Sequence, residues 1–244
     1  MKKLLLTSLA VPAMMLGLST AASAQEVEVS ASVDYVSEYV FRGVTLAGDA
    51  IQPGLEASFG NFTFGGWLSV PIENGSNFDT ELDLYIGYSF DLFENVSTDV
   101  GLTVYHYPES GGLFDFGTGG GAASTMEIYG ALGFSGPLEP SLTAYYDLTL
   151  EAFTLEGSVG YSVPLAEKTS FDIGATVGAV SVKGAGDYQY GSLSGAVSYA
   201  VSEATSVYVG ANFGFSSEDT FLKLSSFTPK GSSAWFGAGI STGF

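Results

Sequence analysis

Acidic side chains at alternate positions are the residues of this sequence that point most clearly to a chemical role. They occur in stretches where apolar and polar residues alternate, as in Glu81-Leu82-Asp83-Leu84. Successive side chains of a strand point to opposite faces, so these carboxylates are predicted to share the face opposite the apolar one. The predicted set comprises Asp34, Glu38, Glu56, Glu81, Asp83, Glu127, Asp147 and Glu156, together with Glu28, Glu151 and Asp172.

Arg42 is the cation predicted on this acidic face, because it has the same strand phase as Asp34 and Glu38. An arginine among carboxylates in a wall of low dielectric constant pairs with them strongly. Two interpretations stay open. The arginine can form a channel constriction set against an acidic wall, or it can belong to an ion-pair network that locks the strands together. Both interpretations place Arg42 inside the protein.

The single histidine suggests a different chemistry. His106 shares the apolar phase of its strand, as does Ser124 at the start of the next alternating run, and a histidine beside a serine can act as a base for a nucleophile. A lipid hydrolase that uses His106 and Ser124 is therefore an alternative. No carboxylate or asparagine in the same phase would orient the histidine, so an interfacial side chain near the extracellular rim is the favoured interpretation. Interfacial aromatic positions are also predicted for Tyr39, Phe41, Tyr107, Tyr146 and Tyr161.

Alternation of the kind seen from Thr80 to Tyr107 recurs along the chain and predicts the strands that position these residues. Runs of about ten residues with one apolar face are the length that a tilted strand needs to cross a bilayer. They indicate an all-β fold, a twelve-stranded antiparallel outer-membrane barrel. The predicted runs are 26–41, 50–59, 62–71, 80–90, 97–107, 124–135, 141–149, 152–163, 169–181, 189–200, 204–215 and 232–244.

The connections between the runs are alternately short and long, as in outer-membrane barrels. Short turns are predicted at Gly60-Asn61 and at every second connection after it. The other connections are predicted to be long, at 42–49, 72–79, 108–123, 182–188 and 216–231, and only the connection around Glu151 departs from this rule. The last run ends on Phe244, and an aromatic closing strand is interpreted as the signal that the barrel-assembly machinery reads.

The first residues predict a secretory signal peptide, residues 1–24, cleaved after Ala24. Lys2 and Lys3 precede an apolar stretch that is too short for a spanning helix. Residues 25–244 are then one barrel domain. A net charge of −19 disfavours nucleic acid as a partner, and the absence of cysteine excludes disulfides and thiolate metal sites. No cofactor or metal is predicted.

The segment Ser37-Glu38-Tyr39-Val40-Phe41-Arg42-Gly43-Val44-Thr45 resembles the opening motif of the TorF-type porin family of bacterial outer-membrane barrels, whose function is largely unknown. Trp67-Leu68-Ser69, Glu81 to Tyr88, Tyr105 to Pro108 and Glu127-Ile128-Tyr129 follow in the family's order. The family carries Gln-Thr where this chain has Leu46-Ala47.

The resemblance implies an outer-membrane barrel of a Gram-negative bacterium that acts as a channel. The predicted function is passive diffusion of small solutes, with a preference for cations that follows from the acidic lumen. The predicted partners are outer-membrane lipid and small solutes or cations. A lipid hydrolase and a structural or adhesive barrel without conductance remain the alternatives.

Overall fold

The computed structural model describes residues 27–73, 78–117 and 122–244 of the protein. The predicted signal peptide and its cleavage site after Ala24 therefore lie outside the described residues. Within these ranges, no helix has the length and apolar character that a membrane crossing requires.

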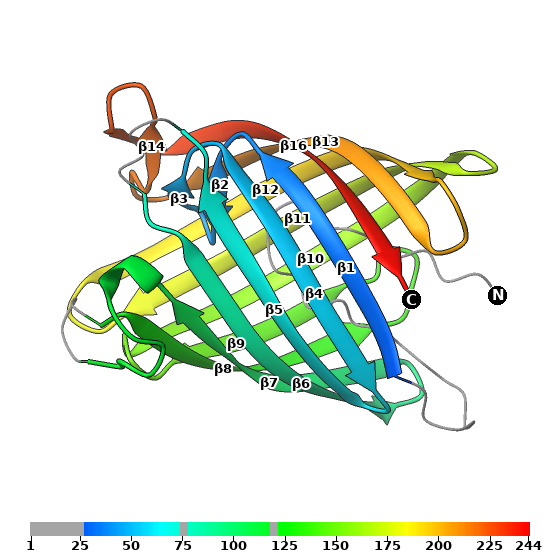
Figure 1. Cartoon of the computed structure of the whole chain (residues 1–244), viewed down its shortest axis with the longest axis horizontal. Helices are drawn as coiled ribbons and strands as arrows, with labels where there is room; N and C mark the ends of the chain where they lie inside the picture. Colours follow the sequence, from blue (N-terminus) through cyan, green and yellow to red (C-terminus); the bar gives the residue numbers. More distant parts are fainter. Residues whose placement is uncertain (1–26, 74–77, 118–121) are drawn as a thin grey trace.

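A closed antiparallel barrel of twelve strands forms the body of the protein (Figure 1). Strand β1 (Val27–Val36) closes it by pairing with both β16 (Ser232–Gly243) and β4 (Ala50–Phe59). The number and order of strands predicted from alternation are confirmed. Between β4 and β16 the wall continues through β5 (Phe62–Pro71), β6 (Glu81–Phe93), β7 (Val96–His106), β8 (Ser124–Phe134), β9 (Ser141–Asp147), β10 (Ala152–Ala166), β11 (Thr169–Val182), β12 (Gly186–Ala200) and β13 (Thr205–Ser216).

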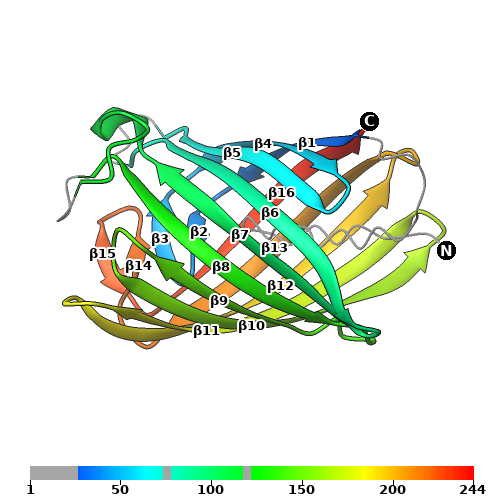
Figure 2. The same ribbon diagram turned by 90° about the horizontal axis from the view of Figure 1, so that it is seen from below.

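The two ends of the barrel differ in the length of their connections (Figure 2). At the turn end, short turns follow β4, β6, β8, β10 and β12. At the loop end lie the long connections that follow β1, β5, β7 and β13, of which residues 37–49, 72–73, 78–80, 107–117, 122–123 and 217–231 are described; they include the 3-10 helix η1 (Pro108–Ser110). The long connection predicted at 182–188 is wrong. Strands β11 and β12 stay paired as far as Val182 and Gly186, and Gly184 turns the chain with a positive φ of 80°.

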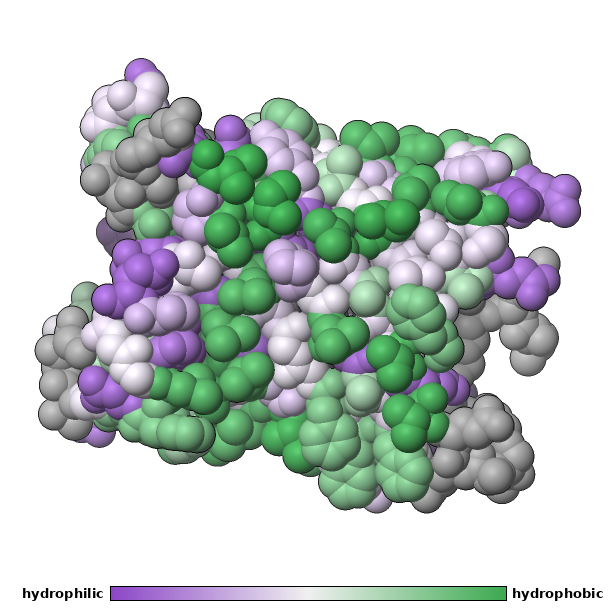
Figure 3. All heavy atoms as spheres, in the orientation of Figure 1, coloured by the Kyte–Doolittle hydropathy of each residue, from purple (hydrophilic) through white to green (hydrophobic). Residues whose placement is uncertain are grey.

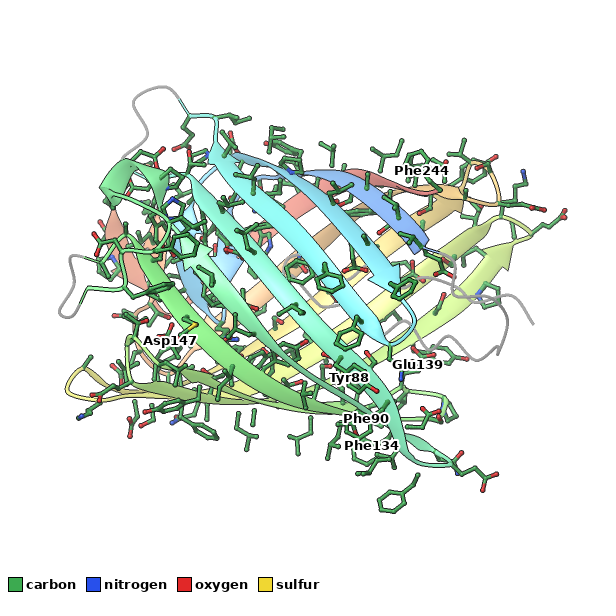
Figure 4. All side chains as sticks on the ribbon, turned by 60° about the horizontal axis from the view of Figure 1, so that its bottom comes forward. Tyr88, Phe90, Phe134, Glu139, Asp147 and Phe244 are labelled. Atoms are coloured by element: carbon green, nitrogen blue, oxygen red, sulfur yellow. The ribbon has the colours of Figure 1, made fainter. Side chains whose placement is uncertain are left out.

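Apolar side chains cover the outside of the barrel because the alternation places one face of every strand outward. Ile86 is 39% exposed although it lies in the middle of β6. The view in Figure 3 shows apolar residues over the strands, with hydrophilic residues gathered toward both ends. Tyr88, Phe90 and Phe134 point away from the barrel near the turn end (Figure 4). An apolar belt edged by aromatic rings is the surface that a barrel presents to lipid.

A hairpin between β1 and β4 folds into the barrel and corrects the prediction of one strand over 26–41. Strand β1 ends at Val36, and the chain then forms β2 (Tyr39–Phe41) and β3 (Val44–Ala47). We call Tyr39–Ala47 the inner hairpin. Its residues keep the alternation of a strand, so the pattern alone could not separate it from β1. Figures 1 and 2 show it within the ring of strands at the loop end.

The inner hairpin packs against several parts of the wall at once. Tyr39 and Ala47 are 3% and 1% exposed and form a core with Val36 and Ala50 of β1 and β4. The Tyr39 ring also contacts Trp67 of β5, with 5.4 Å between ring centroids. On the opposite side, Val40 packs with Phe221 and Trp235. Phe221 comes from a second small hairpin at the loop end, formed by β14 (Phe221–Lys223) and β15 (Thr228–Lys230). The inner hairpin, with Phe221 packed against it, therefore fills part of the lumen at the loop end.

Candidate functional site

The tip of the inner hairpin carries Arg42 across the lumen to the opposite wall. Arg42 and Gly43 form a two-residue turn with φ values of 46° and 77°, and both residues of the common type I′ hairpin turn have positive φ. A side chain at position 43 is excluded, because its Cβ would lie 2.5 Å from the Cβ of Tyr190 on β12. The glycine thus allows the tip to rest against the wall, which leaves the arginine next to it aimed across the lumen.

Arg42 forms a bidentate ion pair with Glu127 of β8. Its Nη1 lies 2.6 Å from Oε2 of the carboxylate, and its Nη2 lies 2.8 Å from Oε1. The Tyr105 hydroxyl donates a further hydrogen bond of 2.9 Å to Oε1. The guanidinium also stacks on aromatic rings, 3.9 Å from the ring centre of Tyr145 and 4.6 Å from that of Phe41.

This ion pair is enclosed, with 9% of the Arg42 side chain and 5% of the Glu127 side chain exposed. Removing two charges from water costs free energy, which only close geometry and further hydrogen bonds offset. The bidentate contact, the tyrosine hydroxyl and the two rings supply that compensation here. Sequence analysis predicted Arg42 on the phase of a wall strand. The structure places it instead on a hairpin turn, and its partner lies 85 residues further along the chain.

Tyrosine hydroxyls hold a series of carboxylates on the inner wall. Because each bond fixes a carboxylate against the wall, the acidic groups have defined positions inside the barrel. The tyrosines belong to the same strand phase as the carboxylates, and this shared phase is the signal by which they could have been found in the sequence. Asp99 has that phase too and was missed. The pairs are Tyr208 with Asp34 at 2.6 Å, Tyr85 with Glu56 at 3.0 Å, Tyr129 with Asp99, and Tyr190 with Glu156.

Three other predicted carboxylates bind hydroxyl or backbone donors. Glu38 accepts a hydrogen bond of 2.6 Å from Thr45 of the inner hairpin and another from Ser233 of β16. Asp172 accepts hydrogen bonds from the hydroxyls of Ser162, Ser170 and Ser198. Asp147 binds the backbone N–H groups of residues 149 and 150 at 2.8 and 2.7 Å. This capping of the turn explains why the connection that follows β9 is short.

Two residues of the predicted acidic face lie at the ends of the barrel, where they are exposed. Glu151 is at the loop end, where it pairs with Lys183, and 48% of its side chain is exposed. The hydrogen bond and charge of Glu151 raise the pKa of Lys183. Glu28 is exposed in the first turn-end residues of β1. Strand phase predicts the face on which a residue lies, but it does not predict whether the residue lies at the end of the barrel wall.

Glu81 and Asp83 form the most enclosed acidic pair of the inner wall. They are 3% and 0% exposed, and within the described residues both carboxylate oxygens of Asp83 lack a hydrogen-bond partner. Tyr39 of the inner hairpin faces them, and so does Tyr107, which follows β7. Burial and the two carboxylates raise the pKa of Tyr107, so its hydroxyl stays protonated. The prediction of Tyr39, Phe41 and Tyr107 as interfacial aromatics is therefore wrong. Tyr146 and Tyr161 do lie on the exposed outer face.

His106 and Ser124 are neighbours, but the prediction that His106 lies at the lipid surface is wrong. His106 is 6% exposed and Ser124 is 0% exposed, because the segment after β7 covers them. His106 Nδ1 lies 2.9 Å from the serine hydroxyl and 3.1 Å from the Ala123 carbonyl oxygen. The hydroxyl itself donates to the Leu113 carbonyl at 2.7 Å. The serine proton thus points to a backbone acceptor, and the group fastens the loop to the barrel.

Comparisons with known proteins identify one family and a group of similar folds. The model of a bacterial protein family of unknown function, Gcw_chp, matches residues 20–211. A search of curated proteins finds no match.

Several solved outer-membrane barrels have a similar fold. The KdgM porin in complex with disordered oligogalacturonate has a TM-score of 0.56 at 11% identity, over 89% of this chain and 99% of that one. The NanC porin also has a TM-score of 0.56 at 11% identity, over 88% and 98% of the two chains. An outer membrane channel from Pseudomonas putida F1 has a TM-score of 0.50 at 7% identity, over 93% and 98%.

Proposed function

The chain belongs to the Gcw_chp family of bacterial proteins of unknown function, and from that premise we propose that it forms an outer-membrane channel through which small solutes, preferentially cations, diffuse passively. The acidic inner wall is the observation that carries this proposal. Low-dielectric walls focus the field of such carboxylates, which attracts cations and repels anions. Arg42 offsets little of this field, because Glu127 neutralises it.

The passage available to a solute is narrow. Twelve strands lie between the eight of a filled barrel and the sixteen or more of a wide porin. The inner hairpin and Phe221 reduce the opening further at the loop end. The recess that remains beside the hairpin is lined by Val40, Arg42, Glu156, Tyr190, Phe221 and Trp235. A passage narrowed in this way favours ions and small molecules over oligomers.

The resemblance of Ser37 to Thr45 to the TorF-type porins supports a channel role, and this segment covers most of the inner hairpin and the two residues that lead into it. The solute of a structural neighbour does not transfer with its fold. Oligogalacturonate, which the KdgM porin binds, is a polyanion. The carboxylates of this inner wall would repel such a solute, so a different class of cargo is proposed here.

Reversal potentials in planar bilayers test the proposed selectivity. In a KCl gradient the protein should favour K⁺ over Cl⁻ at low salt. The preference should weaken as the screening length shortens to about 10 Å at 0.1 M salt. Glu156→Gln should reduce the preference, because Glu156 lines the recess beside Arg42.

A matched control for this measurement is Glu139→Gln, which changes a carboxylate in the turn between β8 and β9 (Figure 4). It should leave the reversal potential unchanged. Selectivity for anions in the parent protein would contradict the acidic-lumen proposal. A folded barrel without any conductance would favour a structural or adhesive role.

We also propose that β16 and the adjoining Phe244 are read by the barrel-assembly machinery. Phe244 is 81% exposed on the outside of the turn end, and its backbone N–H donates to the Val29 carbonyl at 2.8 Å (Figure 4). Phe244→Asp should lower the amount of folded barrel in the outer membrane. Phe227→Asp, which changes an exposed loop-end residue, should lower it less. Gel-shift assays of folded protein in membrane fractions measure both, and equal amounts would refute the proposal.

A further inference from the structure

Asp83 lies in an enclosed environment that leaves its charge uncompensated. It is 0% exposed, and neither of its carboxylate oxygens has a hydrogen-bond partner among the described residues. Glu81, two positions earlier on the same face of β6, places a second carboxylate beside it. The two ion pairs found in the described residues use Arg42 and Lys183 with other partners, so no basic side chain neutralises Glu81 or Asp83. A buried, unpaired carboxylate is costly, and it requires a proton or a cation.

The Tyr39 hydroxyl gives independent evidence that this enclosure holds a ligand. It comes from the inner hairpin, is buried, and makes no hydrogen bond within the described part of the chain, although it faces Glu81 and Asp83. A phenol beside two carboxylates would ordinarily donate to one of them. The Tyr39 hydroxyl oxygen and both Asp83 oxygens are therefore buried without a hydrogen-bond partner, and Asp83 is one of the two carboxylates that the hydroxyl faces. The Tyr107 hydroxyl, directly after β7, faces the same two carboxylates and donates to Glu81.

We infer that Glu81, Asp83, Tyr39 and Tyr107 form a site for a hard divalent cation of the calcium type, which ties the inner hairpin to the barrel wall. One divalent ion neutralises both carboxylates, whereas a proton or a sodium ion neutralises one. The carboxylates offer four oxygens of the type that calcium prefers, and the neutral phenol hydroxyls offer two further oxygen atoms. This reaches the lower end of the roughly six to eight ligands that calcium takes. No cluster of three or more metal-ligating acidic, histidine or cysteine side chains occurs in the described residues, so the two phenols are essential to the set.

Such a site would control how firmly the hairpin is held. Tyr39 belongs to β2, the two acids belong to β6, and Tyr107 follows β7, so one ion would join the hairpin to two neighbouring wall strands. The inference does not depend on channel activity, because ion binding and barrel stability can be measured without any conductance.

Terbium luminescence tests the site directly in the purified full barrel after treatment with EDTA. Tyr39 and Tyr107 should sensitise bound Tb³⁺ when the tyrosines are excited, and added Ca²⁺ should displace it. Millimolar Ca²⁺ should also raise the thermal midpoint of the parent protein, because a ligand that binds only the folded state stabilises it. Asp83→Asn should abolish the luminescence or lower the apparent Ca²⁺ affinity at least about tenfold.

The control is Asp99→Asn, which removes another buried inner-wall carboxylate, one whose hydroxyl partners are Ser89 and Tyr129. This variant should keep the response to Ca²⁺. In EDTA, Asp83→Asn should be at least as stable as the parent, because it removes an unpaired charge. If Asp83→Asn does not fold, Tyr39→Phe serves as the test in its place. It removes a single oxygen and should weaken Ca²⁺ binding. An unchanged Tb³⁺ signal in Asp83→Asn would overturn the inference. The inference would also be overturned if Ca²⁺ did not change the thermal midpoint of the parent barrel and only a lower pH raised it, since Glu81 and Asp83 would then share a proton.

Discussion

Replacing Arg42 with alanine is expected to lower the free energy of unfolding by about 3–5 kcal/mol, the cost of breaking a buried ion pair by removing one partner. The Glu127 carboxylate would remain enclosed, with the Tyr105 hydroxyl as its remaining hydrogen-bond donor among the described side chains. The rings of Phe41 and Tyr145 would also lose their contacts with the guanidinium. Denaturant titration of the barrel in lipid vesicles, followed by tryptophan fluorescence, measures the change.

Two further variants separate the ion pair from simple packing. Arg42→Ala combined with Glu127→Gln should be more stable than Arg42→Ala alone, because the second change removes the unpaired charge. Arg42→Lys should recover only part of the stability, since a lysine cannot make the bidentate contact. A loss below about 1 kcal/mol for Arg42→Ala, the value typical of an exposed pair, would show that water reaches this site.

Placing an arginine on the outer face of β6 should destabilise the barrel in proportion to its depth in the bilayer. Ile86→Arg, near the middle of the strand, should cost about 2–4 kcal/mol. Leu92→Arg is the matched control, because Leu92 is 47% exposed and lies near the turn end, where β6 has an irregularity between Asp91 and Phe93. There the cost should fall to about 0–1 kcal/mol, because the charge reaches water.

Unfolding in lipid vesicles is the appropriate measurement, since detergent micelles adapt to the charge. Equal costs at positions 86 and 92 would mean that the apolar belt does not face a bilayer of ordinary thickness. A cost at 92 larger than that at 86 would place the midplane closer to the turn end than proposed.

The wall of the barrel could be predicted because its signal is local. A period of two along β6 and β7 decides both the strand and the face of each residue, and paired strands repeat it. Because the signal is only local, it also explains why the inner hairpin was predicted as part of the first strand. The inner hairpin alternates as a strand does, and its turn uses Arg42-Gly43 rather than the Asn-Gly or Asp-Gly that mark most hairpins. No sequence period could separate it from β1.

The candidate site depends on contacts between distant parts of the chain. Arg42 was predicted to face the interior, but its partner Glu127 is one of several carboxylates of suitable phase. His106 has the outward phase that was predicted for it, yet the loop that covers it follows no periodic pattern. Strand phase therefore predicts the direction of a side chain, whereas the partner it meets depends on how hairpins and loops fold over the wall.

The position of the inner hairpin between β1 and β4 has a consequence for the order in which the chain folds. The hairpin lies early in the sequence, but Arg42 at its tip contacts Glu127, 85 residues further on, and the adjoining Glu38 contacts Ser233, 195 residues further on. Closing such long loops is entropically expensive and slow. The hairpin can therefore dock fully only when β16 reaches β1, and it must be on the inner side at that moment. Pairing of β16 with β1 and docking of the hairpin are then a single late event. After it, the hairpin cannot leave the lumen without passing through the loop-end opening.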